Sequence, residues 1–68
     1  MANRLGPEYD KLYEAAKNIV IRDRKASTSY IQRQLRIGYN MAATIIDDLE
    51  DAGVISMPDN TGRRTVIK

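Results

Sequence analysis

The chain has 68 residues, enough to build one small hydrophobic core and therefore one domain. Apolar residues make up 43 % and charged residues 29 %, which is ordinary globular usage and argues against intrinsic disorder. The sequence has no cysteine and no histidine, so we expect no disulfide, no metal site, no cofactor and no enzymatic activity. No apolar run approaches the roughly 20 residues of a membrane span, and the composition favours a small cytoplasmic binding domain.

The charges are segregated along the chain, although the net charge is only +2. Residues 22–36 carry a local balance of +4, residues 41–52 a balance of −4, and the last six residues a balance of +3. A folded domain with this pattern can be basic on one side only, as polyanion-binding proteins are. Ordinary solvated faces would give the same pattern, and charge alone does not decide between the two interpretations.

The first predicted helix covers about residues 7–24. Pro7 suits the first helical position, where its missing N–H has no helical partner to lose, and Glu8 and Asp10 favour the positive end of the helix dipole. Residues 1–6 are predicted to be an N-terminal tail. The apolar face of the helix recurs at three- and four-residue intervals and consists of Tyr9, Leu12, Tyr13, Ala16, Ile19 and Val20.

The second predicted helix is short and follows a polar break at residues 26–28, which could itself pair as a brief strand. Ser29 followed by Gln32 fits a capping box, in which two side chains satisfy free backbone N–H groups at the helix start. The helix is expected to end near Arg36. Its apolar positions are Tyr30, Ile31 and Leu35.

A tight turn at residues 37–40 leads into a third helix, which covers about residues 40–52. Gly38 is free to adopt a positive φ in this turn, and Asn40 is a possible helix cap. Gly53 occupies the position at which a glycine commonly ends a helix. The buried stripe of the third helix is expected to be Ala42, Ile45, Ile46, Leu49 and Ala52.

The last predicted element is a β-hairpin. Residues 54–57 are predicted to form a strand, residues 58–62 a turn, and residues 63–68 the returning strand. Two helices joined by a turn of about four residues that contains glycine are typical of a helix-turn-helix, and a hairpin directly after them is a wing. We therefore expect a mainly helical α+β fold, a winged helix-turn-helix over residues 7–68 with three helices and a C-terminal β-hairpin wing.

The start of the third helix is the candidate base-contacting segment. In a helix-turn-helix, the second helix of the motif enters the major groove and its N-terminal residues reach the base edges. Asn40, Met41 and Thr44 point away from the predicted core at this end, and Tyr39 lies just before them. Asparagine can bond adenine in a bidentate way, whereas methionine and threonine offer apolar contact and one hydroxyl.

Basic side chains flank this segment in the sequence. Arg33 and Arg36 lie on the preceding helix and at its end, where they are suited to contact phosphates or an adjacent base. Arg63 and Arg64 open the second strand of the predicted wing, from which a side chain could follow the minor groove or the backbone. A further basic cluster at the end of the first helix consists of Arg22, Arg24 and Lys25.

The second half of the third helix is acidic. Asp47 and Asp48 would repel phosphate if they faced it, so DNA should meet only the first one or two turns of this helix. We expect these acids to be solvated. Adjacent carboxylates on a helix point in different directions and therefore do not form a catalytic acid/base pair.

Residues 24–40, RKASTSYIQRQLRIGYN, resemble the gamma domain of the FtsK/SpoIIIE DNA translocases, and the likeness continues to about residue 67. The resemblance implies a winged helix at the C-terminus of a hexameric, ATP-driven motor that acts in chromosome segregation and cell division. Such domains bind short, polar, G-rich sequences in double-stranded DNA and so load and orient the motor. In some members they also contact and activate a Xer tyrosine recombinase. The resemblance further implies a bacterial, nucleoid-associated protein.

The sequence departs from the family at one place. After Gly-Tyr-Asn the family usually has Arg-Ala-Ala-Arg, whereas residues 41–44 here are Met-Ala-Ala-Thr. Arginine suits guanine O6 and N7, and each arginine–guanine pair is worth roughly 1–3 kcal/mol of discrimination. We therefore expect a relaxed or changed base preference.

Three alternatives follow from the same residues. A protein-interaction winged helix, with the recombinase as its main partner, is favoured by the missing arginines and by an acidic stripe of Asp47, Asp48 and Asp51. A small transcriptional repressor would form a stable dimer on a palindromic site. A free-standing gamma-like regulator from a mobile element would occupy the orienting sequences without a motor.

Overall fold

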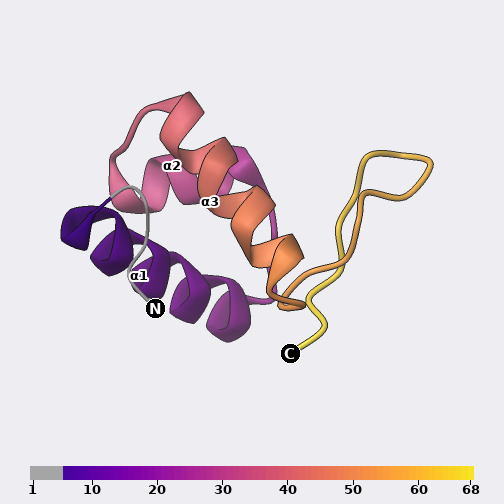
Figure 1. The fold of residues 1–68 in the computed structure, drawn as a ribbon. Coiled ribbons are helices and arrows are strands. Elements are labelled where there is room, and N and C mark those ends of the chain that lie inside the picture. The colour runs from indigo at the N-terminus through magenta and orange to yellow at the C-terminus, as the bar shows by residue number, and fades with distance from the viewer. Residues whose placement is uncertain (1–5) are drawn as a thin grey trace.

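The computed structural model describes residues 6–68, which form three helices followed by a loop that doubles back (Figure 1). The helices are α1 (Pro7–Asp23), α2 (Thr28–Leu35) and α3 (Tyr39–Asp51). Helices α2 and α3 pack against each other and against α1. The predicted tail, residues 1–6, lies outside the described residues except for Gly6. No helix within residues 6–68 is both long enough and apolar enough to cross a bilayer.

The start of α2 differs from the prediction by two residues. Its N-cap is Ser27, which has an extended backbone and whose Oγ accepts a hydrogen bond from the N–H of Tyr30 at 3.3 Å. The predicted capping box at Ser29 is therefore wrong, because Ser29 already lies inside the first helical turn. No strand forms at residues 26–28, since Thr28 belongs to the helix.

The turn between α2 and α3 has three residues, as a helix-turn-helix requires, but its left-handed residue is not the glycine. Arg36 has φ 55°, and its N–H bonds the carbonyl of Gln32, which ends α2. Gly38 instead has φ −70° and is the N-cap of α3 without a side-chain bond. Asn40 lies inside α3 and does not cap it, so both predictions for this turn are wrong.

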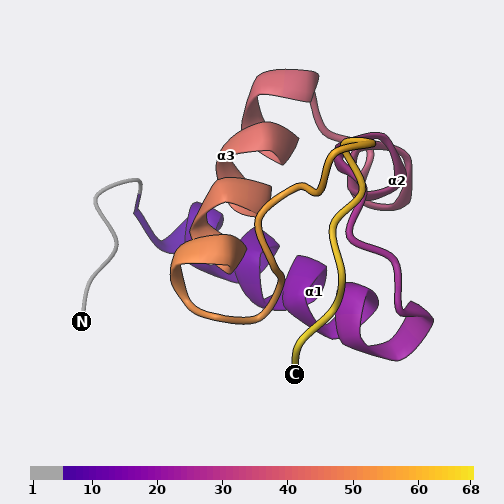
Figure 2. The ribbon, with the colours of Figure 1, turned by 90° about the vertical axis from the view of Figure 1, so that its right-hand side faces the viewer.

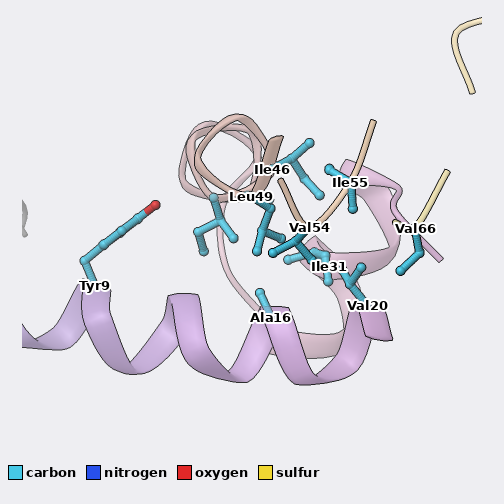
Figure 3. Packing of buried hydrophobic residues seen from close by; sticks show 11 residues of the cluster. Tyr9, Ala16, Val20, Ile31, Ile46, Leu49, Val54, Ile55 and Val66 are labelled. Atoms are coloured by element: carbon cyan, nitrogen blue, oxygen red, sulfur yellow. The ribbon is translucent and has the colours of Figure 1, made fainter. Parts of the chain in front are cut away.

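The core of the described residues is aliphatic apart from one tyrosine (Figure 3). From the predicted face of α1, Tyr9 is buried, whereas Tyr13 packs at the edge of the core. Ala52 of the predicted α3 stripe is exposed, because the chain turns at Gly53 (φ 76°) just after it. Val54 and Ile55 enter the core after this turn. The buried residues are Tyr9, Ala16, Val20, Ile31, Ala42, Ile45, Ile46, Leu49, Val54, Ile55 and Val66.

The predicted β-hairpin wing is wrong. Residues 54–68, called the C-terminal loop below, contain no strand, so the described part of the chain is helical rather than α+β. The two limbs of the loop run side by side and project from the helices (Figures 1 and 2). They are joined by one isolated antiparallel bridge between Ile55 and Val66.

Side chains replace the hydrogen bonds that would have extended this bridge into a ladder. The N–H of Thr65 bonds the Oγ of Ser56 at 2.9 Å, and the carbonyl of Ser56 accepts from Arg64 Nη1 at 3.1 Å. Pro58 has no N–H to donate. The carboxylate of Asp59 accepts from the backbone N–H groups of Thr61 and Arg63 and so folds the tip into a turn of its own. Such local side-chain bonds compete with sheet formation.

Truncation of the core should be costly in a domain this small. We expect Ile31→Ala to lower the free energy of unfolding by about 2–5 kcal/mol, because it leaves a cavity beside α3. The exposed Ile67, with 60 % of its surface accessible, is the matched control, and Ile67→Ala should change stability by less than about 0.5 kcal/mol. Urea denaturation followed by circular dichroism measures both. Equal effects at the two positions would contradict the assigned core.

Candidate nucleic-acid interface

A groove of about 810 Å³ opens where the start of α2, the start of α3 and the tip of the C-terminal loop meet. Four of its lining residues are cationic, and none of those described is acidic. The cations come from two segments that are distant in sequence, the α1–α2 junction and the loop tip. A concave surface with charge of one sign attracts ligands of the opposite sign. The cationic residues are Arg24, Lys25, Arg63 and Arg64.

Tyr39 and Asn40 are exposed at the start of α3, as predicted for residues that contact a ligand. Tyr39 has 59 % of its surface accessible and lines the groove. Met41 is only half exposed, because it packs against the core. The hydroxyl of Thr44 donates to the carbonyl of Asn40 at 3.0 Å, which occupies the one hydrogen atom this side chain can offer. Of the four predicted base-contacting residues, Tyr39 and Asn40 are thus the most accessible.

Arg33 and Arg36 are exposed at the end of α2, outside the lining of the groove. Neither makes an ion pair within residues 6–68. Arg33 lies in the last turn of α2, and Arg36 follows it at the left-handed cap. Their guanidinium groups are therefore available to a polyanion that lies against the helix-turn-helix.

The two neighbouring arginines of the C-terminal loop have different surroundings. Arg63 is exposed at the loop tip, and its backbone is held by Asp59. The Arg64 side chain is only 16 % exposed and lies against α3. Its Nη1 is 2.5 Å from Glu50 Oε1, and its Nη2 is 3.7 Å from Asp47 Oδ1. The sequence did not predict this difference between Arg63 and Arg64, because the two arginines are adjacent in one polar segment.

Arg24 and Lys25 line the groove but were not among the residues chosen from the sequence. Arg24 adopts φ 57° after α1, and its guanidinium donates to the carbonyl of Val66 at 3.4 Å and of Lys68 at 2.8 Å. The Lys25 ammonium lies 4.8 Å from the centre of the Tyr30 ring, a cation–π contact. The +4 charge balance of residues 22–36 was the signal that pointed to them.

Asp47, Asp48 and Glu50 of α3 contact other parts of the domain. The hydroxyl of Tyr9 donates to the carboxylate of Asp48, which ties α3 to α1. Glu50 and Asp47 face Arg64 of the C-terminal loop. The expectation that Asp47 and Asp48 are simply solvated is therefore wrong for Asp48. Within residues 6–68, no cluster of three acidic side chains could hold a metal ion.

Asp23 fixes the α1–α2 junction on which the groove depends. Its carboxylate accepts from Arg22 at 2.8 and 3.0 Å and from the Tyr30 hydroxyl at 2.6 Å. The bond from Arg22, and then that from Tyr30, hold the pKa of Asp23 well below its usual range. The same bond to Asp23 raises the pKa of the Tyr30 hydroxyl.

Comparisons with known proteins agree on one family. The family described as "Ftsk gamma domain" matches residues 7–68. The chain is 48 % identical over 60 residues to the DNA translocase FtsK of Campylobacter jejuni (strain 81-176), covering 88 % of this chain and 6 % of that protein. Identity is 50 % over 58 residues to FtsK of Brucella melitensis, covering 85 % and 7 %. It is 52 % over 56 residues to FtsK of Rickettsia typhi, covering 82 % and 8 %. The chain thus spans 6–8 % of the length of these relatives.

Removal of the Asp23 charge should destabilise the fold in a pH-dependent way. Because the pKa of Asp23 is lower in the folded protein than its ordinary value of 3.8, the ionised carboxylate stabilises the fold. This stabilisation is fully present above that value and is lost as the pH falls below it. We expect Asp23→Asn to lower the urea midpoint at about pH 6, and the difference from the parent chain to shrink at about pH 3.

Glu14→Gln is the control for this experiment. Glu14 is an exposed acid on the same helix that makes no ion pair within residues 6–68. If the two substitutions change the urea midpoint by the same amount at both pH values, the role assigned to Asp23 is incorrect.

Proposed function

We propose, because this chain belongs to the FtsK gamma domain family, that it binds double-stranded DNA through the helix-turn-helix face formed by α2, the start of α3 and the tip of the C-terminal loop. The observation that carries this proposal is the distribution of charge around α3. The first turn of α3 is uncharged and exposes Tyr39 and Asn40, while exposed arginines lie on the segments before and after it. In its second half, Asp48 bonds Tyr9 of α1, and Asp47 and Glu50 face Arg64.

The phosphate contacts are assigned to the exposed cations on either side of α3. Arg33 and Arg36 flank it from α2, and Arg63 flanks it from the loop. Arginine and lysine contacts to phosphate fix the register of a protein on the duplex but carry no sequence information. Lys25, at the groove, is a further candidate.

The base contacts are assigned to Tyr39 and Asn40. An asparagine can pair with adenine N6 and N7, and the flat face of a tyrosine can contact a thymine methyl or a sugar. Met41 and Thr44 contribute apolar contact at most, because the core and the backbone already engage them. This composition favours a site that contains adenine and discriminates less sharply than an arginine-based site.

The biological role proposed here is that of directing a DNA translocase. Recognition of short, polar, G-rich sequences would load and orient the motor and place the domain on the nucleoid. The relatives named DNA translocase FtsK are much longer than the matched segment, which covers 6–8 % of them. Several copies held on one motor would raise the avidity of a weak single domain through effective concentration.

A Xer tyrosine recombinase is the alternative partner. The acidic stripe that favoured it is reduced in the structure, because Asp48 bonds Tyr9 and Asp47 faces Arg64. A protein partner that binds this acidic stripe would therefore meet fewer free negative charges than the sequence suggested. DNA is the better-supported ligand.

Fluorescence anisotropy with two labelled duplexes tests the proposal. We expect a G-rich duplex that contains adenine to bind more tightly than a scrambled duplex, and the preference to survive a rise in salt concentration. Equal binding that collapses with salt would leave phosphate contacts without sequence preference. Binding to neither duplex would overturn the DNA proposal and favour the recombinase.

Charge removal separates the two partners. We expect the double substitution Arg33→Ala and Arg36→Ala to weaken duplex binding at least tenfold, because about two phosphates are then no longer neutralised by the protein. Lys11→Ala removes an exposed cation of α1 outside the groove and should change the Kd less than about twofold. A double variant that binds DNA as well as the Lys11 control would contradict the proposed face. If the recombinase is the main partner, its binding should survive the double substitution.

A further inference from the structure

The two limbs of the C-terminal loop are joined by only a few backbone hydrogen bonds. At the single bridge, between Ile55 and Val66, the N–H groups of Ser56 and Ile67 donate to the carbonyls of Thr65 and Val54 at 2.9 and 2.8 Å. Nearer the tip, the N–H of Asp59 donates to the carbonyl of Arg63 at 2.9 Å. A two-stranded ribbon with so few bonds is marginal in water even when it is regular. Side-chain contacts must therefore contribute to holding the loop against α3.

Arg64 supplies these contacts. One guanidinium nitrogen, Nη1, bridges two segments, since it lies 2.5 Å from Glu50 Oε1 on α3 and 3.1 Å from the carbonyl of Ser56 on the opposite limb. The second nitrogen, Nη2, lies 3.7 Å from Asp47, one turn earlier on α3. The Arg64 and Glu50 side chains are 16 % and 30 % exposed, so this ion pair is partly shielded from water, whereas Asp47 is 72 % exposed. Arg64 thus connects both limbs of the loop to the acidic half of α3.

The contacts of Arg64 affect the position of its neighbour, Arg63. Successive side chains of an extended segment point to opposite sides, and Arg64 faces α3. Arg63 is exposed at the loop tip and lines the groove beside Tyr39. The position of the Arg63 charge relative to the start of α3 therefore depends on the contacts of Arg64.

We propose that Arg64 is a positioning residue for DNA binding, which holds the C-terminal loop on Glu50 and Asp47 so that Arg63 can contact a phosphate. This inference rests on the proposed function. It replaces the expectation that both arginines contact DNA: Arg64 pairs with acids of α3, and Arg63 faces the ligand. The Arg64 charge also offsets part of the repulsion that Glu50 and Asp47 would exert on a nearby phosphate.

The salt dependence of DNA binding, measured for the two single variants of Arg63 and Arg64 and for the double variant, tests whether the two arginines have these different roles. The magnitude of the slope of log K against log salt concentration falls by about 0.9 for each phosphate that the protein no longer neutralises. We expect Arg63→Gln and Arg64→Gln each to reduce the slope by about 0.9, and the double variant to reduce it by no more than either single variant. If the double variant reduces the slope by about 1.8, both arginines contact phosphate and the proposal is overturned.

Glu50→Gln provides a second test. Its predicted effect on DNA affinity has one sign if Arg64 positions the loop and the opposite sign if Arg64 contacts phosphate. If Glu50 holds Arg64 in place, its loss releases the loop, and the affinity for DNA should fall about threefold or more together with the salt slope. If Arg64 contacts phosphate, loss of Glu50 frees its guanidinium and removes a repulsive charge, so affinity and slope should both rise. A rise would therefore refute the positioning role, even if Arg64→Gln proved too unstable to study.

Hydrogen exchange without DNA separates failure of this inference from failure of the proposed function. The amide N–H groups of Ser56 and Ile67 bond the opposite limb of the loop, at 2.9 and 2.8 Å. We expect Arg64→Gln and Glu50→Gln to speed their exchange several-fold, while Arg63→Gln leaves it unchanged. Unchanged exchange in the Arg64 variant would overturn the proposal whether or not the domain binds DNA. Faster exchange in a chain that binds no duplex would confirm that Arg64 holds the loop and would reject only its link to DNA.

Discussion

The apolar stripe of α3 is the constraint on which the rest of the structure depends. The 63 described residues include few aliphatic side chains that could form a core. Four of the buried ones lie on α3. Ile45 and Leu49 on its inner face have no accessible surface. Because the stripe faces α1, α2 and the start of the C-terminal loop, the opposite side of the helix is left exposed, and its first turn is free of acidic side chains. Core formation and ligand presentation are thus two consequences of one helix orientation.

The arginines of the domain fall into two groups, those that bond its backbone and those that stay exposed. Arg24 and Arg64 donate to backbone carbonyls of the C-terminal loop, where sheet hydrogen bonds are scarce. Arg33, Arg36 and Arg63 remain exposed. A guanidinium has five donors in a rigid fork and can therefore hold two or three acceptors at once, a role that lysine would perform less well. The net charge of the chain says nothing about this division, since all five residues count equally toward it.

The acids of α3 take part in the same arrangement. An acidic C-terminal half is unfavourable for a helix, because the carboxylates lie near the negative end of the dipole. Here Asp48 accepts the hydroxyl of Tyr9 on α1, and Glu50 receives the guanidinium of Arg64. These two acids thus connect α3 to different neighbours. Two of the charges that seemed to oppose polyanion binding are therefore points where α1 and the C-terminal loop contact α3.

Local sequence signals determined the helical part of this protein. The spacing of apolar residues predicted the three helices to within two residues at each end, and the glycine after α3 has the expected positive φ. A continuous resemblance over residues 24–40 also identified the family, because the chain keeps long, specific stretches of its pattern. These features depend on neighbours within a few positions, where sequence and geometry are tightly linked.

Only the tertiary structure decided the conformation of the C-terminal loop and the roles of its arginines. Residues 54–68 have the composition of a hairpin, yet the carbonyl of Ser56 pairs with the Arg64 side chain, and the Thr65 N–H with the Ser56 hydroxyl. The same Arg64 guanidinium pairs with Glu50 on α3, 14 residues away in sequence. Contacts between distant segments carry no local signature, so the sequence determined which charges the domain has, and the packing decided which of them face outward.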